Sequence, residues 1–120
     1  MTMPDERMRS VRWGGELLEQ VASDTGLPDS MIATAKRIVL TYPTPQALEG
    51  WLLAGNPGLL PVWTTAFVDA LALFDQLRID GLGSPRTCND LRYTLRHFPD
   101  TMTVNAMART RWMQEWLRPE

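Results

Sequence analysis

Residues 60–80 read LPVWTTAFVDALALFDQLRID, and this stretch decides the fold class. Its apolar residues recur at intervals of three and four, which places them on one face of a helix. Near the middle of the stretch they almost surround the helix, and such a helix is normally buried in a domain. Asp69, Asp75 and Arg78 interrupt the run, so no uncharged segment reaches the roughly 20 residues that a bilayer requires. We therefore expect the central helix of a helical domain without a membrane span.

Prolines, glycines and capping residues divide the rest of the chain into further helical segments. Proline is well tolerated at the first helical position, and an aromatic residue followed by proline ends a helix. No segment alternates as a strand does. The sequence predicts an all-α fold, a six-helix bundle in one domain over residues 1–120. Helices should open at Pro4, Pro28, Pro45, Pro61, Pro85 and just after Asp100, with caps at Thr44, Ser84 and Asp100.

Gly14 and Gly15 lie inside the first predicted helix. Glycine inside a helix costs about 1 kcal/mol relative to alanine. The pair therefore indicates a break in the helix, a close approach by another helix, or a loop that contacts a ligand.

The two halves of the chain share their helix-breaking residues at nearly constant offsets. Positions 4, 26 and 28 recur 57 residues later, as Pro61, Gly83 and Pro85, and Tyr42-Pro43-Thr44 recurs 56 residues later as Phe98-Pro99-Asp100. This pattern favours two related three-helix units, 1–57 and 58–120, with the apolar helix where they meet. The alternative is that independent helical hairpins reuse the same residues.

Two segments carry a resemblance to known proteins: MTMPDERMRSV at the N-terminus and AKRIVLTYP, an arginine-containing helix that runs into Tyr42-Pro43. They resemble a family of short uncharacterised proteobacterial proteins that open with Met-Thr-Met-Pro-Asp-Glu-Arg and carry an Arg-rich helix ending in Tyr-Pro. LRYTLRHFPD, in the second half, looks like the same helix end. The chain departs from the family pattern at Gly14-Gly15, where a charged residue is usual. The resemblance implies no activity and no site residues.

Composition restricts the class of protein. The formal net charge is −2, which gives no overall attraction to nucleic acid or anionic lipid. Cys88 is the single cysteine, which excludes an intrachain disulfide and fits a reducing compartment. The N-terminal residues are polar rather than signal-like, so a cytoplasmic location is the expectation.

The sequence offers little for catalysis. One His and one Cys cannot form the usual zinc site. His97 lies nine residues after Cys88 on the same predicted helix, a rise of about 13 Å, too far for a hydrogen bond. We therefore predict no catalytic residues, no bound metal and no cofactor, and we expect a protein that is not an enzyme.

Five tryptophans and seven methionines are many for 120 residues, and several gather near the C-terminus. Trp, Met and Arg are enriched in protein interfaces. We expect partner binding, or a homodimer, through this group, although it could instead pack on the protein's own core. Its members are Trp112, Trp116, Met113, Arg109 and Arg111.

The functional prediction is therefore a non-enzymatic protein-binding module, an inhibitor or adaptor such as a phage-type inhibitor, an immunity protein or an antitoxin. The alternative is a helix-turn-helix DNA-binding regulator built from residues 85–118. Six arginines face four acids after residue 85, and Val104 to Arg111 would form the reading helix. Because the whole chain is acidic, nucleic acid is the weaker expectation.

Overall fold

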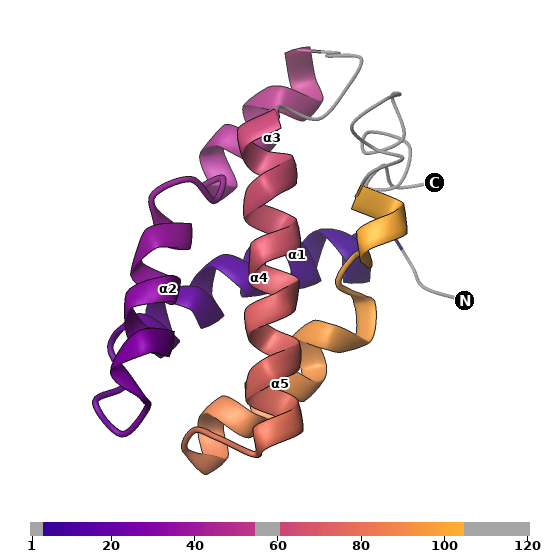
Figure 1. Cartoon of the computed structure of the whole chain (residues 1–120). Coiled ribbons are helices and arrows are strands. Elements are labelled where there is room, and N and C mark those ends of the chain that lie inside the picture. Colours follow the sequence, from indigo (N-terminus) through magenta and orange to yellow (C-terminus); the bar gives the residue numbers. More distant parts are fainter. Residues whose placement is uncertain (1–3, 55–60, 105–120) are drawn as a thin grey trace.

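A computed structural model of the chain describes residues 4–54 and 61–104, and every regular element in those ranges is a helix. The all-α prediction is confirmed there. Residues 101–104 are also helical and follow directly after the Phe98-Pro99 turn. Figure 1 shows α4 running across the front of the molecule, with α1 behind it. The helices are α1 (Pro4–Ala22), α2 (Asp29–Val39), α3 (Pro45–Ala54), α4 (Pro61–Asp80) and α5 (Pro85–His97).

The helix starts follow the proline and cap pattern closely. Pro4, Pro45, Pro61 and Pro85 are first helical residues, whereas Pro28 lies one residue before α2. All three predicted caps accept a backbone N–H: Thr44 Oγ1 from Ala47 at 3.0 Å, Ser84 Oγ from Thr87 at 3.1 Å, and Asp100 Oδ1 from Thr103 at 2.7 Å. The backbone hydrogen bond from Thr103 lowers the pKa of Asp100.

Helix α4 contributes the largest share of the core side chains, but only one of its faces is buried. Its buried side chains include Trp63, Phe67, Phe74 and Leu77. Its other face is open, with Val62 and Ile79 exposed by 47% and 68%. The helix is therefore covered on one side only: α2 and α5 pack against it, α1 runs behind it, and nothing described lies in front of it (Figure 1).

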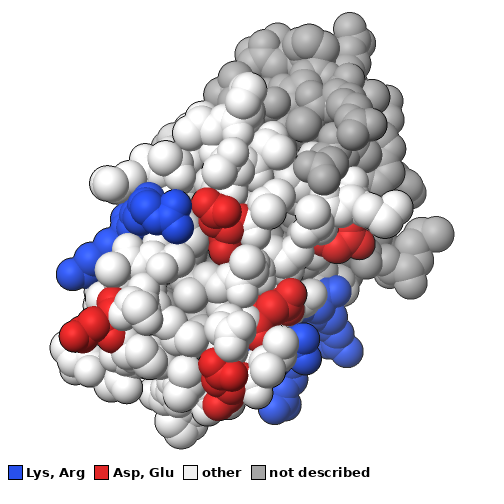
Figure 2. Space-filling model, viewed as in Figure 1, with Lys and Arg blue, Asp and Glu red and all other residues white. Residues whose placement is uncertain are grey.

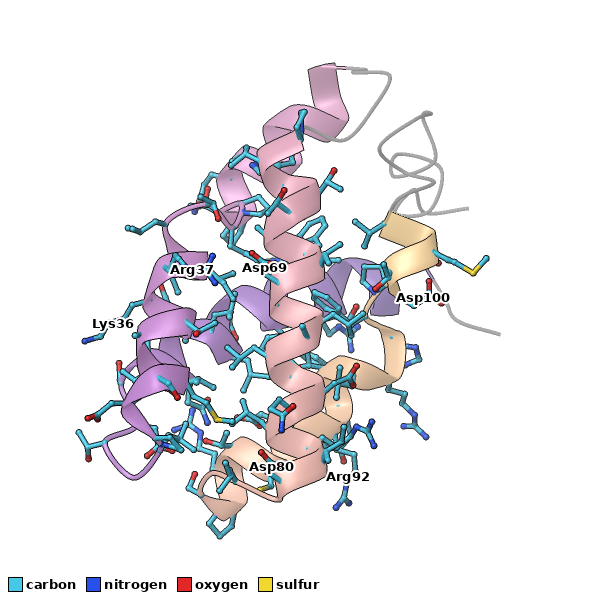
Figure 3. All side chains as sticks on the ribbon, in the orientation of Figure 1. Lys36, Arg37, Asp69, Asp80, Arg92 and Asp100 are labelled. Carbon is cyan, nitrogen blue, oxygen red and sulfur yellow. The ribbon has the colours of Figure 1, made fainter. Side chains whose placement is uncertain are left out.

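Figure 2 shows acidic side chains spread over this side of the molecule, with basic side chains beside them. The acidic side chains of α4 have partners within the chain. Arg37 reaches from α2 to Asp69, with 3.6 Å between Nη1 and Oδ2 (Figure 3). Arg78 contacts Asp75 at 3.5 Å. Both pairs are partly exposed, so each contributes little to stability.

Helix α1 is the main packing partner of both α2 and α5. It runs unbroken through Gly14 and Gly15, and of the three readings of this pair the close approach is the one observed. A Cβ atom on Gly14 would lie 2.5 Å from Tyr42 Oη and 2.7 Å from Phe98 Cε2. Two aromatic side chains therefore occupy the space that a side chain at position 14 would need.

We call this contact the Gly14 junction; it comprises Val11, Gly14, Tyr42, Phe67 and Phe98. The Tyr42 hydroxyl donates a hydrogen bond to the Val11 carbonyl. Phe67 meets Tyr42 edge-on at 5.2 Å and Phe98 edge-on at 6.1 Å between ring centroids. Burial raises the pKa of Tyr42 well above its ordinary value, since the phenolate would lose its hydration.

Candidate functional site

A cleft with a volume of about 550 Å³ lies between α1 and α5. Both walls follow helical spacing, since residues three, four and seven apart share a helix face. We call it the α1–α5 cleft. Its lining residues are Trp13, Glu16, Leu17 and Gln20 from α1, and Arg86, Asn89, Asp90, Tyr93 and Thr94 from α5.

The two walls run antiparallel, and a contact joins them at each end of the cleft. Gln20 Nε2 donates to Thr87 Oγ1 at 2.8 Å near the start of α5. Just after the end of α5, Phe98 packs against Gly14. Thr87 is fixed in turn by Ser84, whose Oγ donates to Thr87 Oγ1 at 3.1 Å and accepts from its backbone N–H. The spacing between the walls is therefore set by contacts at the two ends of the cleft.

The floor of the cleft is buried and its rim is not. Leu17 and Thr94 are 2% exposed. Trp13, Gln20 and Asp90 are partly buried, whereas Glu16, Arg86 and Asn89 are exposed and Tyr93 is half exposed. A buried floor below an aromatic and charged rim is the usual composition of a binding site, where a few polar groups orient the ligand.

Two of the chain's own arginines contact the rim. The Arg9 guanidinium carbon lies 5.8 Å from the centre of the Trp13 ring, within the range of a cation–π contact. Arg86 Nε lies 3.7 Å from Asp90 Oδ2, four residues along α5. The Arg86 and Asp90 side chains are 83% and 41% exposed, so water competes for both ends of this pair.

The partner-binding residues named from the sequence lie outside the described residues: Trp112, Trp116, Met113, Arg109 and Arg111. The same holds for most of the reading helix of the helix-turn-helix alternative, of which only Val104 is described. Trp63, in the apolar stretch of residues 60–80, is buried at 9% exposure.

The structure places Cys88, His97 and Asp69 apart from the cleft lining. Cys88 is partly buried on α5, with its Sγ 3.6 Å from the Leu82 carbonyl oxygen. His97 is the last residue of α5, and Asp69 pairs with Arg37. Among residues 4–54 and 61–104, no group of His, Cys, Asp and Glu is arranged to hold a metal ion, and no helix is long and apolar enough to cross a bilayer.

Sequence reasoning did not single out Trp13 or Tyr93. A usable signal exists, because Trp13, Glu16 and Gln20 share one face of a helix, as do Arg86, Asp90 and Tyr93. Each set mixes aromatic with charged residues. What the spacing could not supply is the pairing of these two faces, since it depends on the Gly14 junction and the Gln20–Thr87 hydrogen bond.

No family model matches the chain, and neither the curated proteins nor the solved structures contain a significant match.

Proposed function

We propose that this chain is a non-enzymatic protein-binding module of the cytoplasm that acts as an inhibitor or adaptor of another protein. The observation that carries the proposal is the α1–α5 cleft. It is a groove of about 550 Å³ with Trp13, Tyr93 and Arg86 on its rim, and these residue types are those enriched at binding hot spots. A segment of the partner would lie in the groove, with the C-terminal Trp112 and Trp116 as a second contact.

Site-specific photo-crosslinking in the native host tests this proposal. A photoreactive phenylalanine analogue replaces Tyr93, which is half exposed on the cleft rim. The matched control places the same analogue at Ile79, which is 68% exposed on the open face of α4. We expect a discrete covalent adduct from position 93 and none from position 79. Absence of an adduct at position 93, or equal adducts at both positions, would contradict the proposal.

The C-terminal contact has its own test. Trp112→Ala combined with Trp116→Ala should leave the helical circular dichroism unchanged and abolish capture of the partner. An unfolded double variant would assign these tryptophans to the core instead.

The helix-turn-helix alternative has one supporting observation: Arg92 and Arg96 are exposed on α5, where they could contact phosphates. Because the whole chain carries a net charge of −2, we expect no binding of duplex DNA at physiological salt. A steeply salt-dependent gel shift at micromolar protein, lost in Arg92→Ala with Arg96→Ala, would favour the alternative over protein binding.

We also propose that the chain arose as two related units, 1–57 and 58–120. In support, Tyr42-Pro43 and Phe98-Pro99 both follow helices that pack on α1, and both aromatic rings contact Gly14. Thr44 and Asp100, at matching positions, cap the next helix in the same way.

A further inference from the structure

The α1–α5 cleft already contacts guanidinium groups of its own chain. Arg9 lies over the Trp13 ring and Arg86 lies beside the Asp90 carboxylate. An aromatic face and a carboxylate are the two groups that recognise an arginine side chain, by cation–π stacking and by charge-assisted hydrogen bonds. The Arg86–Asp90 pair is long and exposed, which makes it weak and replaceable by an incoming cation.

The charge of the lining favours a cationic occupant. Glu16 on the α1 wall and Asp90 on the α5 wall carry two negative charges, and Arg86 carries one positive charge, so the residues that line the cleft are net −1. Arg9, which lies over the Trp13 ring, adds a positive charge at the rim, and an incoming guanidinium would replace it there. The carboxylates belong to opposite walls, so a cation between them would be attracted by both. Asp90 is the carboxylate with a weak, exposed partner, Arg86 at 3.7 Å, so an incoming guanidinium can take the place of Arg86.

We propose that the α1–α5 cleft binds an arginine side chain presented by a partner polypeptide, with the guanidinium between the Trp13 ring and the Asp90 carboxylate. This inference rests on the proposed function and specifies the chemistry of its partner. Arginine fits better than lysine because its planar guanidinium can stack on an indole and donate two parallel hydrogen bonds to one carboxylate.

A polypeptide fits better than a free amino acid because the cleft is larger than one side chain needs. Asn89 is exposed on the rim, and its amide offers both a donor and an acceptor to a peptide backbone. Tyr93, one turn further along α5, adds an amphipathic ring that can cover the residues flanking the arginine.

The test uses the full chain labelled with ¹⁵N and the blocked pentapeptide Gly-Gly-Arg-Gly-Gly. The citrulline peptide, which has nearly the same shape but no charge, is the ligand control, and N-acetylarginine amide represents a small-molecule source. We expect saturable shifts of the Trp13 indole N–H and of the Asn89 and Tyr93 amides. The citrulline peptide should bind about tenfold more weakly, as expected when a charge-assisted hydrogen bond becomes neutral.

Three outcomes of the titration would overturn the inference. The first is equal binding of the arginine and citrulline peptides. The second is the absence of saturable shifts at the cleft residues. The third is binding of N-acetylarginine amide as tightly as the pentapeptide, which would assign the cleft to a small molecule. If the Tyr93 crosslink to a partner forms while the arginine peptide fails to bind, this inference is wrong and the proposed function stands.

Two variants test whether Asp90 is the carboxylate that binds the guanidinium of the peptide. Asp90→Asn should weaken binding of the arginine peptide about five- to tenfold and should reduce its salt dependence. Glu19→Gln is the control, because Glu19 is an exposed acid of α1 that does not line the cleft. Equal affinities of the Asp90→Asn and Glu19→Gln variants would overturn the assignment of the guanidinium to Asp90, whereas a loss confined to Asp90→Asn supports it.

Discussion

The Gly14 junction and the α1–α5 cleft are neighbouring parts of one helix pair, yet they are packed in opposite ways. At the junction two aromatic rings fill the space over a glycine, and not even a methyl group would fit. In the cleft, Trp13 and Tyr93 stand at the rim of a cavity of about 550 Å³. The difference shows how a small helical protein can hold a site open: the walls are fixed where packing is tight, so the space between them need not be filled.

Gly14→Ala should have the largest effect on stability among the glycine substitutions. Its Cβ would meet Tyr42 Oη and Phe98 Cε2 at distances that real structures do not tolerate. Overpacking of this kind costs about 3 kcal/mol, and the better helix propensity of alanine offsets only about 1 kcal/mol of it. We expect the free energy of unfolding, measured with urea, to fall by about 2 kcal/mol or more.

Two other glycines provide controls for Gly14→Ala. At Gly15 a Cβ would lie 3.2 Å from Tyr42 Cε1, so Gly15→Ala should be milder. At Gly50, in α3, nothing lies within 4 Å of the added atom, so Gly50→Ala should stabilise by up to about 1 kcal/mol. A Gly14→Ala variant as stable as Gly50→Ala would show that the junction is not tightly packed.

Gly83→Ala tests the other end of the helix pair. Gly83 has φ of +105° and a Cβ there would lie 2.9 Å from Thr87 Cγ2. Backbone strain and displacement of Thr87, which accepts the Gln20 hydrogen bond, should together lower the free energy of unfolding by about 2 kcal/mol.

Gly81, two residues earlier, serves to distinguish backbone strain from the steric contact with Thr87. Gly81 has φ of +63° with nothing within 4 Å of an added Cβ, so Gly81→Ala should cost only about 1 kcal/mol. If the two variants were equally stable, displacement of Thr87 would have no energetic consequence, and the Gln20–Thr87 contact would not set the width of the cleft.

Much of the fold follows from the sequence because its signals are local. Helix starts and caps depend on residues within one turn, and Thr44, Ser84 and Asp100 behave as their sequence context predicts. The open face of α4 was not predicted, because hydrophobicity shows that a helix can be buried and not how many neighbours will cover it. Val62 and Ile79 are apolar and exposed for that reason.

The cleft could not be predicted, because it depends on contacts between distant residues. Gln20 meets Thr87 across 67 positions of sequence, and Gly14 meets both Tyr42 and Phe98. The sequence instead pointed to Trp112 and Trp116, because residues four apart would share one face of the helix predicted there. The period of the apolar residues shows which side chains share a face of one helix. Predicting a cleft also requires knowing which helix faces pack against each other.

Tyr42→Phe should have an intermediate effect and change the pH dependence of stability. It removes the hydrogen bond to the Val11 carbonyl, at a cost of about 1 kcal/mol near neutral pH. Burial raises the pKa of Tyr42, so the unfolded chain releases the phenol proton first. The Tyr42 hydroxyl therefore makes its full contribution to the free energy of unfolding below about pH 10. Above that pH the contribution falls by about 1.4 kcal/mol per pH unit.

Urea unfolding between neutral pH and pH 11 measures both effects. The wild-type chain should lose stability above pH 10, and Tyr42→Phe should lose less over the same interval. Tyr93→Phe is the control, since it removes a hydroxyl group from a half-exposed ring outside the junction. Parallel pH profiles for wild type and Tyr42→Phe would contradict burial of the hydroxyl at the junction.

Tyr93→Ala should have the smallest effect on stability but should clearly weaken binding. This contrast distinguishes the cleft, where we expect side chains to bind a partner, from the junction, where they stabilise the fold. The ring is 50% exposed and stands at the rim, so its truncation should change the free energy of unfolding by no more than about 0.5–1 kcal/mol. Phe98→Ala, a truncation in the buried junction, should cost about 3 kcal/mol or more.

The partner and the arginine pentapeptide should both bind more weakly to Tyr93→Ala at unchanged helical content. A Tyr93→Ala variant that unfolds as readily as Phe98→Ala would mean that the rim is part of the core, and the cleft would then be a packing defect rather than a site.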